Sequence, residues 1–530
     1  MPQALLRSKL VVVQVCHNFI NARPSQLTSI YGKGLQVLGK NSALGAIYNS
    51  LERQKLDAPK CHPNTRRAVI DRIIGWLIGD IDFDALILWL YGAAGAGKSA
   101  ISHSIAEICE KYGWLLASFF FWKTAGERNN INRFVASIAH QVSLSIPASR
   151  VFVGAAVDEN PFIFQQSVDV QLAKLVIEPL QRLHSTGFDF KASAFVIIVD
   201  GFDECQGSEI QSVLVKSLAA AFRDCPLRIR ILIASRPEVY LQSTLNSSSL
   251  KPHISHLALS NEYSPEEDIY RFLEDSFDRI KREHPLASYI PPSWPSADVI
   301  HELTRKSSGQ FIFASTTVKY IGGDPHQRPH RRLDVIRRLQ PPRGEKDMPY
   351  VELNSLYHHV LSNVDNIETV KLVLGILIVV NPESNEGMYT PEQIDNFLFW
   401  ERGETKACLS QLASVIECDA DCRIYILHAS LSDFLFDPSR SHQFYLCRES
   451  ILGDYAAQGL RHLRQKGCDE SGVFSQKLFY DQVLICNMFG ARFILLHLAY
   501  LRLHSRWPIL HLSTSRGIES TITSGSLWSL

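Results

Sequence analysis

The chain has 530 residues, which is too long for one ordinary hydrophobic core, so we expect two to four domains. With 46% hydrophobic and 20% charged residues, its composition is that of a folded globular protein with little room for long disorder. Lysine plus arginine and aspartate plus glutamate each total 54, so no overall field favours nucleic acid or an anionic membrane. We therefore expect neither of them as a partner.

The eleven cysteines are scattered without a C-x-x-C pair, which indicates reduced thiols in a cytoplasmic protein. Cys418 and Cys422 lack a second pair at zinc-finger spacing, so no metal site is expected there. The N-terminal apolar stretch is interrupted by Gln14 and lacks a cleavage site, which argues against a signal peptide. Residues 483–501 are long enough to span a bilayer, but Arg492 favours a helix outside it.

Residues 85–259 alternate short apolar runs with helical patterns, which is typical of a parallel sheet with crossover helices. The apolar runs are 85–90, 115–122, 194–199 and 229–234. Polar or glycine-containing residues follow each run, at the edge where a doubly wound sheet places its ligands. The sequence therefore predicts an α/β fold here.

The pattern becomes charged and helical over 265–364, with a proline-rich break at 340–343 that we interpret as a linker. Thr390, Pro391 and Gln393 then combine an N-cap, a first-turn proline and a capping-box glutamine, which together mark a helix start. A small helical module with one strand-like run at 423–427 follows. Residues from 513 onward are rich in serine and threonine, and we expect them to be frayed.

The segment 92–99 satisfies the pattern G-x-x-x-x-G-K-[ST], and an apolar strand precedes it while an amphipathic helix follows it. That is the strand–loop–helix arrangement of a P-loop, whose backbone N–H groups and helix N-terminus bind phosphate. We expect Lys98 to reach the β- and γ-phosphates and Ser99 to ligate Mg²⁺. The predicted nucleotide-binding residues are Gly92, Ala93, Ala94, Gly95, Ala96, Gly97, Lys98, Ser99 and Ala100.

About a hundred residues later, the apolar run 195–199 ends in Asp200, which is the pattern of a Walker B strand. We expect Asp200 to hold the Mg²⁺ shell. Asp203 and Glu204 follow at positions that could orient or deprotonate an attacking water. Surface acids after a strand are the alternative interpretation.

The next apolar run ends in Arg236, at the tip of a strand that should neighbour the Walker B strand. An arginine at this position can sense a γ-phosphate, although a surface arginine is the alternative. A GTPase would need an N-K-x-D motif, which the sequence lacks. The serine–glycine run 307–310 follows the Walker B, whereas the signature of an ABC transporter ATPase precedes it. Metabolic kinases usually lack the D-G-x-D-E extension at 200–204.

These residues resemble the NACHT family of signal-transducing ATPases, which includes the NOD-like receptors, and especially its fungal members. The D-G-x-D-E form of the Walker B at 200–204 separates NACHT proteins from other P-loop ATPases. Further similarities lie at 61–66, at 118–121 with 127–130, at 235–237 and at 308–314, and together they cover roughly residues 45–440.

The resemblance implies a P-loop NTPase domain, a helical domain and a winged-helix-like domain that close over ADP and open on exchange for ATP. It also implies that a winged-helix histidine reaches the ADP β-phosphate, and His428 is the candidate, although Ala429 departs from the usual Met-His-Asp form. A core or surface histidine is the alternative. Residues 61–66 would lie near the adenine.

We accordingly divide the chain into an N-terminal segment without an assigned fold, a NACHT domain, a helical domain, a winged-helix-like domain and a C-terminal helical region with a frayed tail. Their bounds are 1–60, 61–262, 263–345, 346–440 and 441–530. No internal repeat is present, so the N-terminal effector and C-terminal repeat sensor usual in the family are not found. The chain would then be a truncated or minimal member.

The function we expect is an ATP/ADP switch with slow Mg²⁺-dependent hydrolysis, in signalling or self/non-self recognition, forming a nucleotide-dependent homo-oligomer. The alternatives are an interaction module that binds nucleotide without hydrolysing it, including a truncated relic, and a P-loop kinase for a small molecule. The sequence identifies no activating ligand and no protein partner.

Overall fold

The computed structural model describes residues 24–55, 60–123, 127–129, 131–190, 194–223, 225, 227–259, 263, 265–339, 350–379, 389–418 and 423–466. The chain divides into two compact units, 1–455 and 456–530, and in the second only the end of one helix is described. The predicted linker at 340–343, the helix at 483–501, the frayed tail and the stretch around Gln14 lie outside the described residues.

Among the described residues, the helices α2 (Pro24–Lys40), α3 (Leu51–Lys55) and α4 (Arg67–Ile78) precede the sheet. The segment after α2 belongs to the core of the sheet domain, because Leu38, Ala43 and Ala46 are fully buried in the same cluster as the strands. The Ser137 hydroxyl accepts a hydrogen bond from the Ala43 N–H at 2.8 Å. Of the segment to which the sequence assigned no fold, the part around Leu38, Ala43 and Ala46 therefore packs on the sheet's helical cover.

Five parallel strands form the sheet in the order β2-β3-β4-β1-β5. They are β1 (Ile87–Tyr91), β2 (Leu115–Phe120), β3 (Phe195–Asp200), β4 (Ile229–Ser235) and β5 (Ile254–Ala258). The four predicted apolar runs are thus strands. β5 was not among them, because Ser255 and His256 interrupt its apolar pattern and it lies at the edge of the sheet. The predicted α/β class and P-loop NTPase sheet are confirmed.

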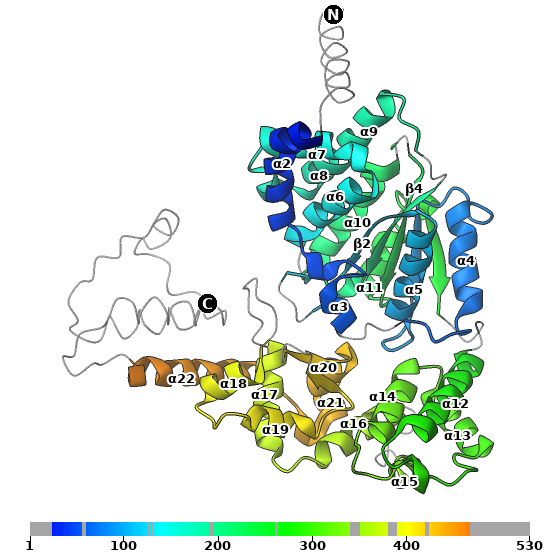
Figure 1. The fold of residues 1–530 in the computed structure, drawn as a ribbon, viewed down its shortest axis with the longest axis vertical. Coiled ribbons are helices and arrows are strands. Elements are labelled where there is room, and N and C mark those ends of the chain that lie inside the picture. The colour runs from blue at the N-terminus through cyan, green and yellow to red at the C-terminus, as the bar shows by residue number, and fades with distance from the viewer. Residues whose placement is uncertain are drawn as a thin grey trace, which may run out of the picture. The chain divides into compact units, whose positions relative to one another are not determined.

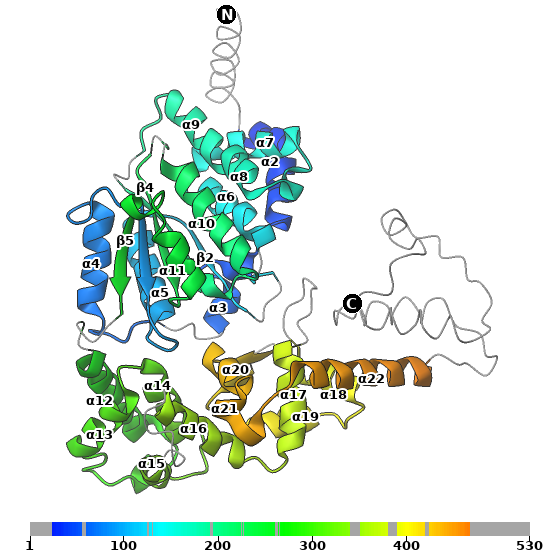
Figure 2. The same cartoon turned by 180° about the vertical axis from the view of Figure 1, so that it is seen from behind.

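Helices cover both faces of this sheet (Figures 1 and 2). α4 and α5 (Lys98–Lys111) pack on one face, and the other is covered by α6 (Phe134–Ser145), α7 (Arg150–Glu159), α8 (Val168–Leu172), α9 (Glu178–Ser185), α10 (Ser208–Arg223) and α11 (Val239–Leu245). Short helical turns connect these elements: η1 (Leu44–Ala46), η2 (Ile131–Arg133), η3 (Pro147–Ser149), η4 (Ile163–Gln165), the π-turn η5 (Ala173–Ile177), η6 (Phe202–Glu204) and η7 (Lys251–His253).

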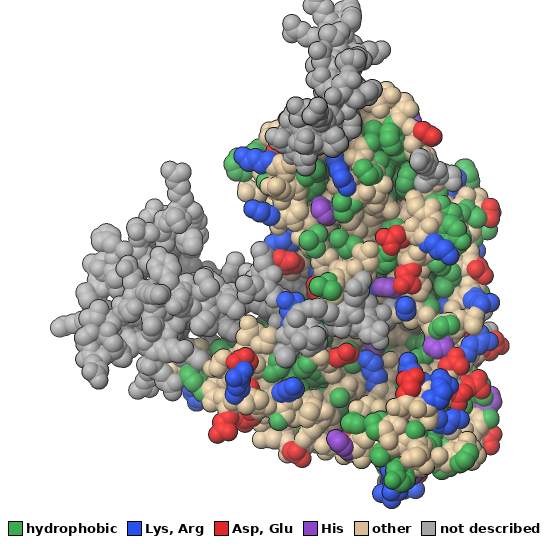
Figure 3. All heavy atoms as spheres, viewed as in Figure 1, with side chains coloured by type: hydrophobic (Ala, Val, Ile, Leu, Met, Phe, Trp, Pro, Cys, Tyr) green, Lys and Arg blue, Asp and Glu red, His purple; other side chains and the backbone are tan. Residues whose placement is uncertain are grey.

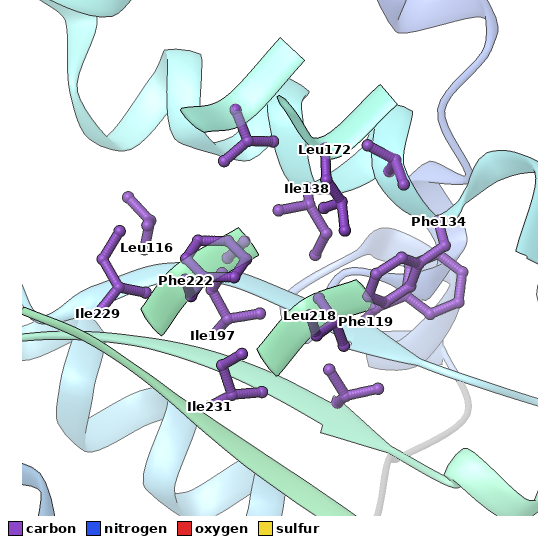
Figure 4. Packing of buried hydrophobic residues seen from close by; sticks show 14 of the residues in the cluster. Leu116, Phe119, Phe134, Ile138, Leu172, Ile197, Leu218, Phe222, Ile229 and Ile231 are labelled. Carbon is purple, nitrogen blue, oxygen red and sulfur yellow. The ribbon is translucent and has the colours of Figure 1, made fainter. Parts of the chain in front are cut away.

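Alternate residues of each strand enter opposite cores, as the period of two in a strand requires. In β3, Ile197 and Val199 pack under α6 and α10, whereas Val196 and Ile198 face α4 and α5. Figure 4 shows Ile197 and Ile231 beneath Phe222 of α10 and Ile138 of α6. Burying each of these side chains contributes about 1.5–3 kcal/mol, so two apolar cores hold the carboxyl edge of the sheet rigid.

Beyond the sheet the chain is mostly helical, as predicted. The helices are α12 (Pro265–Glu283), α13 (Ala297–Ser307), α14 (Phe311–Gly322), α15 (Pro329–Arg338), α16 (Val351–Ser362), α17 (Ile367–Val379), α18 (Pro391–Leu398), α19 (Glu404–Ser410), α20 (Ala429–Leu435), α21 (Pro438–Ser441) and α22 (Arg448–Lys466), with turns η9 (Ala287–Tyr289) and η10 (His442–Phe444).

Two short antiparallel strands, β6 (Ile416–Cys418) and β7 (Ile424–Ile426), follow α18 and α19, which gives the helix-plus-hairpin order of a winged helix. β7 is the predicted strand, and β6 was not predicted because Glu417 interrupts its apolar pattern. The predicted start of α18 is confirmed: the Thr390 hydroxyl accepts from the Gln393 N–H, and the Gln393 side chain accepts from the Thr390 N–H.

No helix among the described residues is long and apolar enough to cross a membrane. The seven cysteines in that part of the chain are free thiols. Figure 3 shows acidic and basic side chains interspersed over the visible face, without a field of one sign. Within the described ranges, no cluster of three or more His, Cys, Asp or Glu side chains could hold a metal ion.

Candidate functional site

The loop between β1 and α5 lies at the carboxyl edge of the sheet, where β1 is flanked by β4 and β5. Gly95 and Gly97 have φ angles of +74° and +93°, which residues other than glycine rarely adopt. Gly97 is also the N-cap residue of α5, so the loop turns directly into the helix. The geometry is that of a phosphate-binding loop, with the helix N-terminus directed at the space that the loop encloses.

Lys98 folds back over this loop. Its ammonium group donates to the carbonyl oxygens of Gly92 at 2.8 Å and Ala93 at 2.9 Å. Burial lowers the pKa of Lys98, while the negative charge of Asp203 acts in the opposite direction. The lysine therefore lies among the acids that follow β3, with its charge directed at the loop.

Asp200 ends β3 and is only 3% exposed. Burial raises the pKa of its carboxyl group, whereas a hydrogen bond from Ser99 lowers it. The Oδ1 atom has no hydrogen-bond partner within the described part of the chain. A buried carboxylate oxygen without a partner, next to a serine hydroxyl, is a donor set that suits Mg²⁺.

Asp203 lies in η6, which begins after Gly201 at φ +64°. Its Oδ1 accepts from the backbone N–H of Arg236 at 2.9 Å, and its Oδ2 lies 3.2 Å from Arg236 Nε. β3 pairs with β4, as predicted, which is what brings the two residues together. The structure therefore places the aspartate and the predicted γ-phosphate sensor in one bidentate contact.

Glu204 is the acid with a pKa suited to proton transfer. Burial raises the pKa of its carboxyl group to about 7, and the charge of Asp203 adds to this effect. Its Oε2 accepts from the backbone N–H of Lys123 at 2.8 Å, which fixes the side chain. A base that titrates near neutrality can take a proton from water at physiological pH.

Asp433 of α20 is a site residue that the sequence analysis missed. Its Oδ2 lies 2.6 Å from Arg236 Nη1, and its Oδ1 lies 4.0 Å from Lys123 Nζ. The sequence offered no signal for it, because Asp433 is one of 54 acidic residues and lies 197 positions from Arg236.

His428 lies at the N-cap position of the same helix. Loss of surrounding water lowers the pKa of its imidazole to about 4, and the charge of Lys319 adds to this. Among the described residues, no hydrogen bond or ion pair joins His428 to the loop 92–100. The structure thus brings the other predicted site residues together, whereas no hydrogen bond or ion pair among the described residues connects His428 to that loop.

The phosphate loop is also held by residues from outside the sheet. The Ile312 N–H at the start of α14 donates to the Gly95 carbonyl at 3.3 Å. Arg66 Nη2 donates to the Ala96 carbonyl at 2.8 Å, the Arg66 N–H donates to Asp268 Oδ2 at 2.9 Å, and its guanidinium lies 4.9 Å from the Phe311 ring. The segment 61–66 therefore links this loop to α12 and α14.

Comparison with known proteins gives one family match. The sequence profile described as Nephrocystin 3, N-terminal, matches residues 73–236, which run from α4 through the loop and the acids Asp200, Asp203 and Glu204 to Arg236. The match covers less than half of the chain. No curated protein matches it.

Comparison with solved structures gives only a distant likeness. The Aeropyrum pernix ORC2 protein in ADPNP–ADP complexes is 11% identical, with a TM-score of 0.31, covering 77% of this chain and 97% of its own. CDC6P from Pyrobaculum aerophilum is 11% identical, with a TM-score of 0.33, covering 71% and 93%. Drosophila ORC bound to poly(dA/dT) DNA and Cdc6 is 10% identical, with a TM-score of 0.23, covering 91% and 72%. Likeness at this level does not distinguish among P-loop proteins.

Proposed function

We propose that this protein is an ATP/ADP-binding molecular switch of the NACHT type, with slow Mg²⁺-dependent hydrolysis that times its return to the resting state. The loop 92–99 binds the phosphates through its N–H groups and the N-terminus of α5. Lys98 exchanges its two carbonyl partners for phosphate oxygens. ADP and ATP compete for this site.

Ser99 and Asp200 would hold Mg²⁺, and the unpartnered Oδ1 of Asp200 supports this role. The bound ion would neutralise charge on the β- and γ-phosphate oxygens. Glu204, with a pKa near 7, accepts a proton from the attacking water, and Asp203 holds Arg236 in place. These assignments give every predicted residue around the loop a separate task.

The contact between Arg236 and Asp433 carries the proposal of a switch. An arginine at the tip of β4 can bind a γ-phosphate only with a free guanidinium edge, and here Nη1 is already bound to a carboxylate of α20. A γ-phosphate would compete with Asp433 for the same nitrogen, whereas ADP would not. The two nucleotides therefore stabilise different states, which is the requirement for a ligand-driven population shift.

The family profile that ends at Arg236 and the D-G-x-D-E acids favour this class over a small-molecule kinase. The resemblance to NACHT proteins suggests a cytoplasmic role in signalling or self/non-self recognition, with assembly into a homo-oligomer when ATP is bound. The domain bounds given above follow from the same resemblance.

Isothermal titration calorimetry of the full chain with ADP and with Mg-ATP tests the proposal. Lys98→Ala should abolish measurable binding of both, and Lys111→Ala, at the exposed far end of the same helix, should bind as wild type does. Unchanged binding in Lys98→Ala would refute the phosphate-loop assignment.

Phosphate release separates the alternatives. A switch should release phosphate slowly without a second substrate and lose this activity in Glu204→Gln. Nucleotide binding without release would indicate a non-hydrolysing module. A rate that depends on a small acceptor would indicate a kinase.

A further inference from the structure

Arg53 of α3 is a buried cation that no part of the proposed mechanism uses. It is 4% exposed, and its guanidinium carbon lies 3.8 Å from the centroid of the Phe120 ring. Both its Nε and Nη2 are buried and have no hydrogen-bond partner in the described part of the chain. Unsatisfied buried donors cost stability, and the cost is larger when the group is charged.

A second buried arginine lies beside it. Arg128 is 2% exposed, donates from Nε to the Phe120 carbonyl at 3.2 Å, and contacts Glu52 Oε1 through Nη1 at 3.1 Å. Its Nη2 is also buried without a partner. Arg128 therefore anchors α3 through Glu52 and adds positive charge next to Arg53.

The two arginines lie at the metal-binding end of β3. Phe120, which contacts both, pairs with Asp200 in the parallel ladder, and the Phe121 N–H donates to the Asp200 carbonyl at 2.9 Å. Burial lowers the pKa of Arg53 to about 9, the charge of Arg128 adds to this, and Asp200 and Glu52 oppose it. Arg53 thus lies within electrostatic range of the carboxylate that accepts from Ser99.

A single bound anion could accept hydrogen bonds from the unpartnered nitrogens of Arg53 and Arg128. Glu52 is already engaged by Arg128, so it does not neutralise both arginines. In P-loop NTPases the loop serine and the Walker B aspartate lie beside the terminal phosphates. A cation on the β2 side of Asp200 would therefore lie near the γ end of a bound triphosphate.

We propose that Arg53 binds the terminal phosphate of a nucleoside triphosphate held by the loop 92–99, with Arg128 holding α3 in the position that this contact needs. The proposal rests on the proposed nucleotide site and adds a second phosphate sensor on the opposite side of β3 from Arg236. It makes α3 a part of the site that distinguishes triphosphate from diphosphate.

Arg230 provides a matched control. It is also buried, at 2% exposure, but both of its terminal nitrogens donate to backbone carbonyls, those of Trp76 and Phe83. It lies at the start of β4, at the edge of the sheet opposite the loop. Arg230→Met should therefore lower Tm and leave the preference between nucleotides unchanged.

The test compares a nonhydrolysable ATP analogue with ADP, both with Mg²⁺, by calorimetry on the full chain, together with thermal unfolding. Arg53→Met still packs on Phe120 but removes the two unpartnered donors. We expect its Tm to stay the same or rise, its affinity for the analogue to fall about 10- to 100-fold, and its affinity for ADP to change less than about 2-fold. Arg53→Lys keeps the positive charge but lacks the paired donors of the guanidinium, so its affinity for the analogue should lie between those of wild type and Arg53→Met.

The proposal would be overturned if a folded Arg53→Met protein lost affinity for the ATP analogue and for ADP equally. It would also be overturned if the ratio of these two affinities stayed as in wild type. If Arg53→Met does not fold, the test uses Arg53→Lys instead. An Arg53→Lys protein with the same ratio of ATP-analogue affinity to ADP affinity as wild type would reject the phosphate contact. If wild type binds neither nucleotide, the proposed function fails first, so the two failures are distinguishable.

Adding inorganic phosphate tests whether the anion at Arg53 is the terminal phosphate of a nucleotide or a free phosphate ion. Added to the nucleotide-free protein, it should leave the Tm of wild type unchanged, because a terminal phosphate needs the loop and the metal to hold it. A phosphate-dependent rise in Tm that Arg53→Met abolishes would overturn the assignment to nucleotide and indicate a free phosphate site.

Discussion

Arg236 Nη1 lies 2.6 Å from Asp433 Oδ2, and these two residues are 197 positions apart in the chain. The same guanidinium holds Asp203 through Nε at 3.2 Å. One arginine therefore connects the acids that follow β3 to helix α20. Both side chains of the pair are about three-quarters buried, at 24% and 23% exposure, so the interaction is partly protected from water.

Replacing Asp433 by asparagine should shift the nucleotide preference towards ATP. The substitution keeps the shape of the side chain and removes the charge that competes with a γ-phosphate for Arg236. An ion pair of this exposure contributes up to about 1 kcal/mol, so we expect affinity for a nonhydrolysable ATP analogue to rise about 2- to 5-fold, with ADP affinity unchanged. Calorimetry measures both.

Glu392→Gln is the control for that experiment, because it removes the exposed ion pair with Arg402 on a different helix. It should change neither affinity. Lower affinity for the ATP analogue in Asp433→Asn would contradict the competition between carboxylate and phosphate.

Glu204 should make the stability of the nucleotide-free protein depend on pH. Its pKa rises from an ordinary value of 4.5 to about 7 on folding, so the folded state binds more protons than the unfolded state between these values. Its contribution to the free energy of unfolding is therefore favourable at low pH and is lost as pH rises through 7. Urea denaturation at pH 5 and pH 8 should show Glu204→Gln gaining stability relative to wild type at the higher pH. A constant difference between the two proteins would contradict the raised pKa.

His428 should make the stability of the folded protein depend on pH in the opposite direction to Glu204. Its pKa falls from 6.5 to about 4 on folding, so the unfolded state binds more protons between these values, and the folded state loses stability as pH falls from 6.5 towards 4. His428→Gln should be less sensitive to acid over this window, measured by urea denaturation at pH 4.5 and pH 7. If His428 also reaches ADP, the same variant will bind ADP more weakly and the ATP analogue as wild type does.

Gly95→Ala should disrupt the phosphate loop. The φ of +74° is strained for alanine, and the added methyl group would collide with the Ile312 side chain of α14. A cost of about 1–3 kcal/mol should appear as a lower Tm, with loss of nucleotide binding. Gly39→Ala is the control, because a methyl group there meets nothing within 4 Å and α2 should gain about 0.5–1 kcal/mol. Ile312→Ala should restore part of the stability of Gly95→Ala, and no restoration would reject the collision.

The site residues that the sequence predicted are those set by local chemistry. A glycine-rich loop between a strand and a helix, and acids after a buried strand, can be identified from a few neighbouring letters. β5 and β6 were missed because polar residues interrupt their apolar pattern. Asp433, Arg53 and Arg128 could not be found in this way, since their roles come from contacts between distant segments. A buried arginine has the same letter as an exposed one, and only the fold shows that its nitrogens lack partners.

Lys98 donates hydrogen bonds to the carbonyls of Gly92 and Ala93, so the loop itself supplies two acceptors for the ammonium group. An incoming anion must replace both acceptors at once, or the ammonium group loses more than it gains. Chloride has no oxygen atom for this exchange, whereas each phosphate group of a nucleotide offers several. Lys98 would therefore favour anions with several acceptor oxygens over simple halide ions.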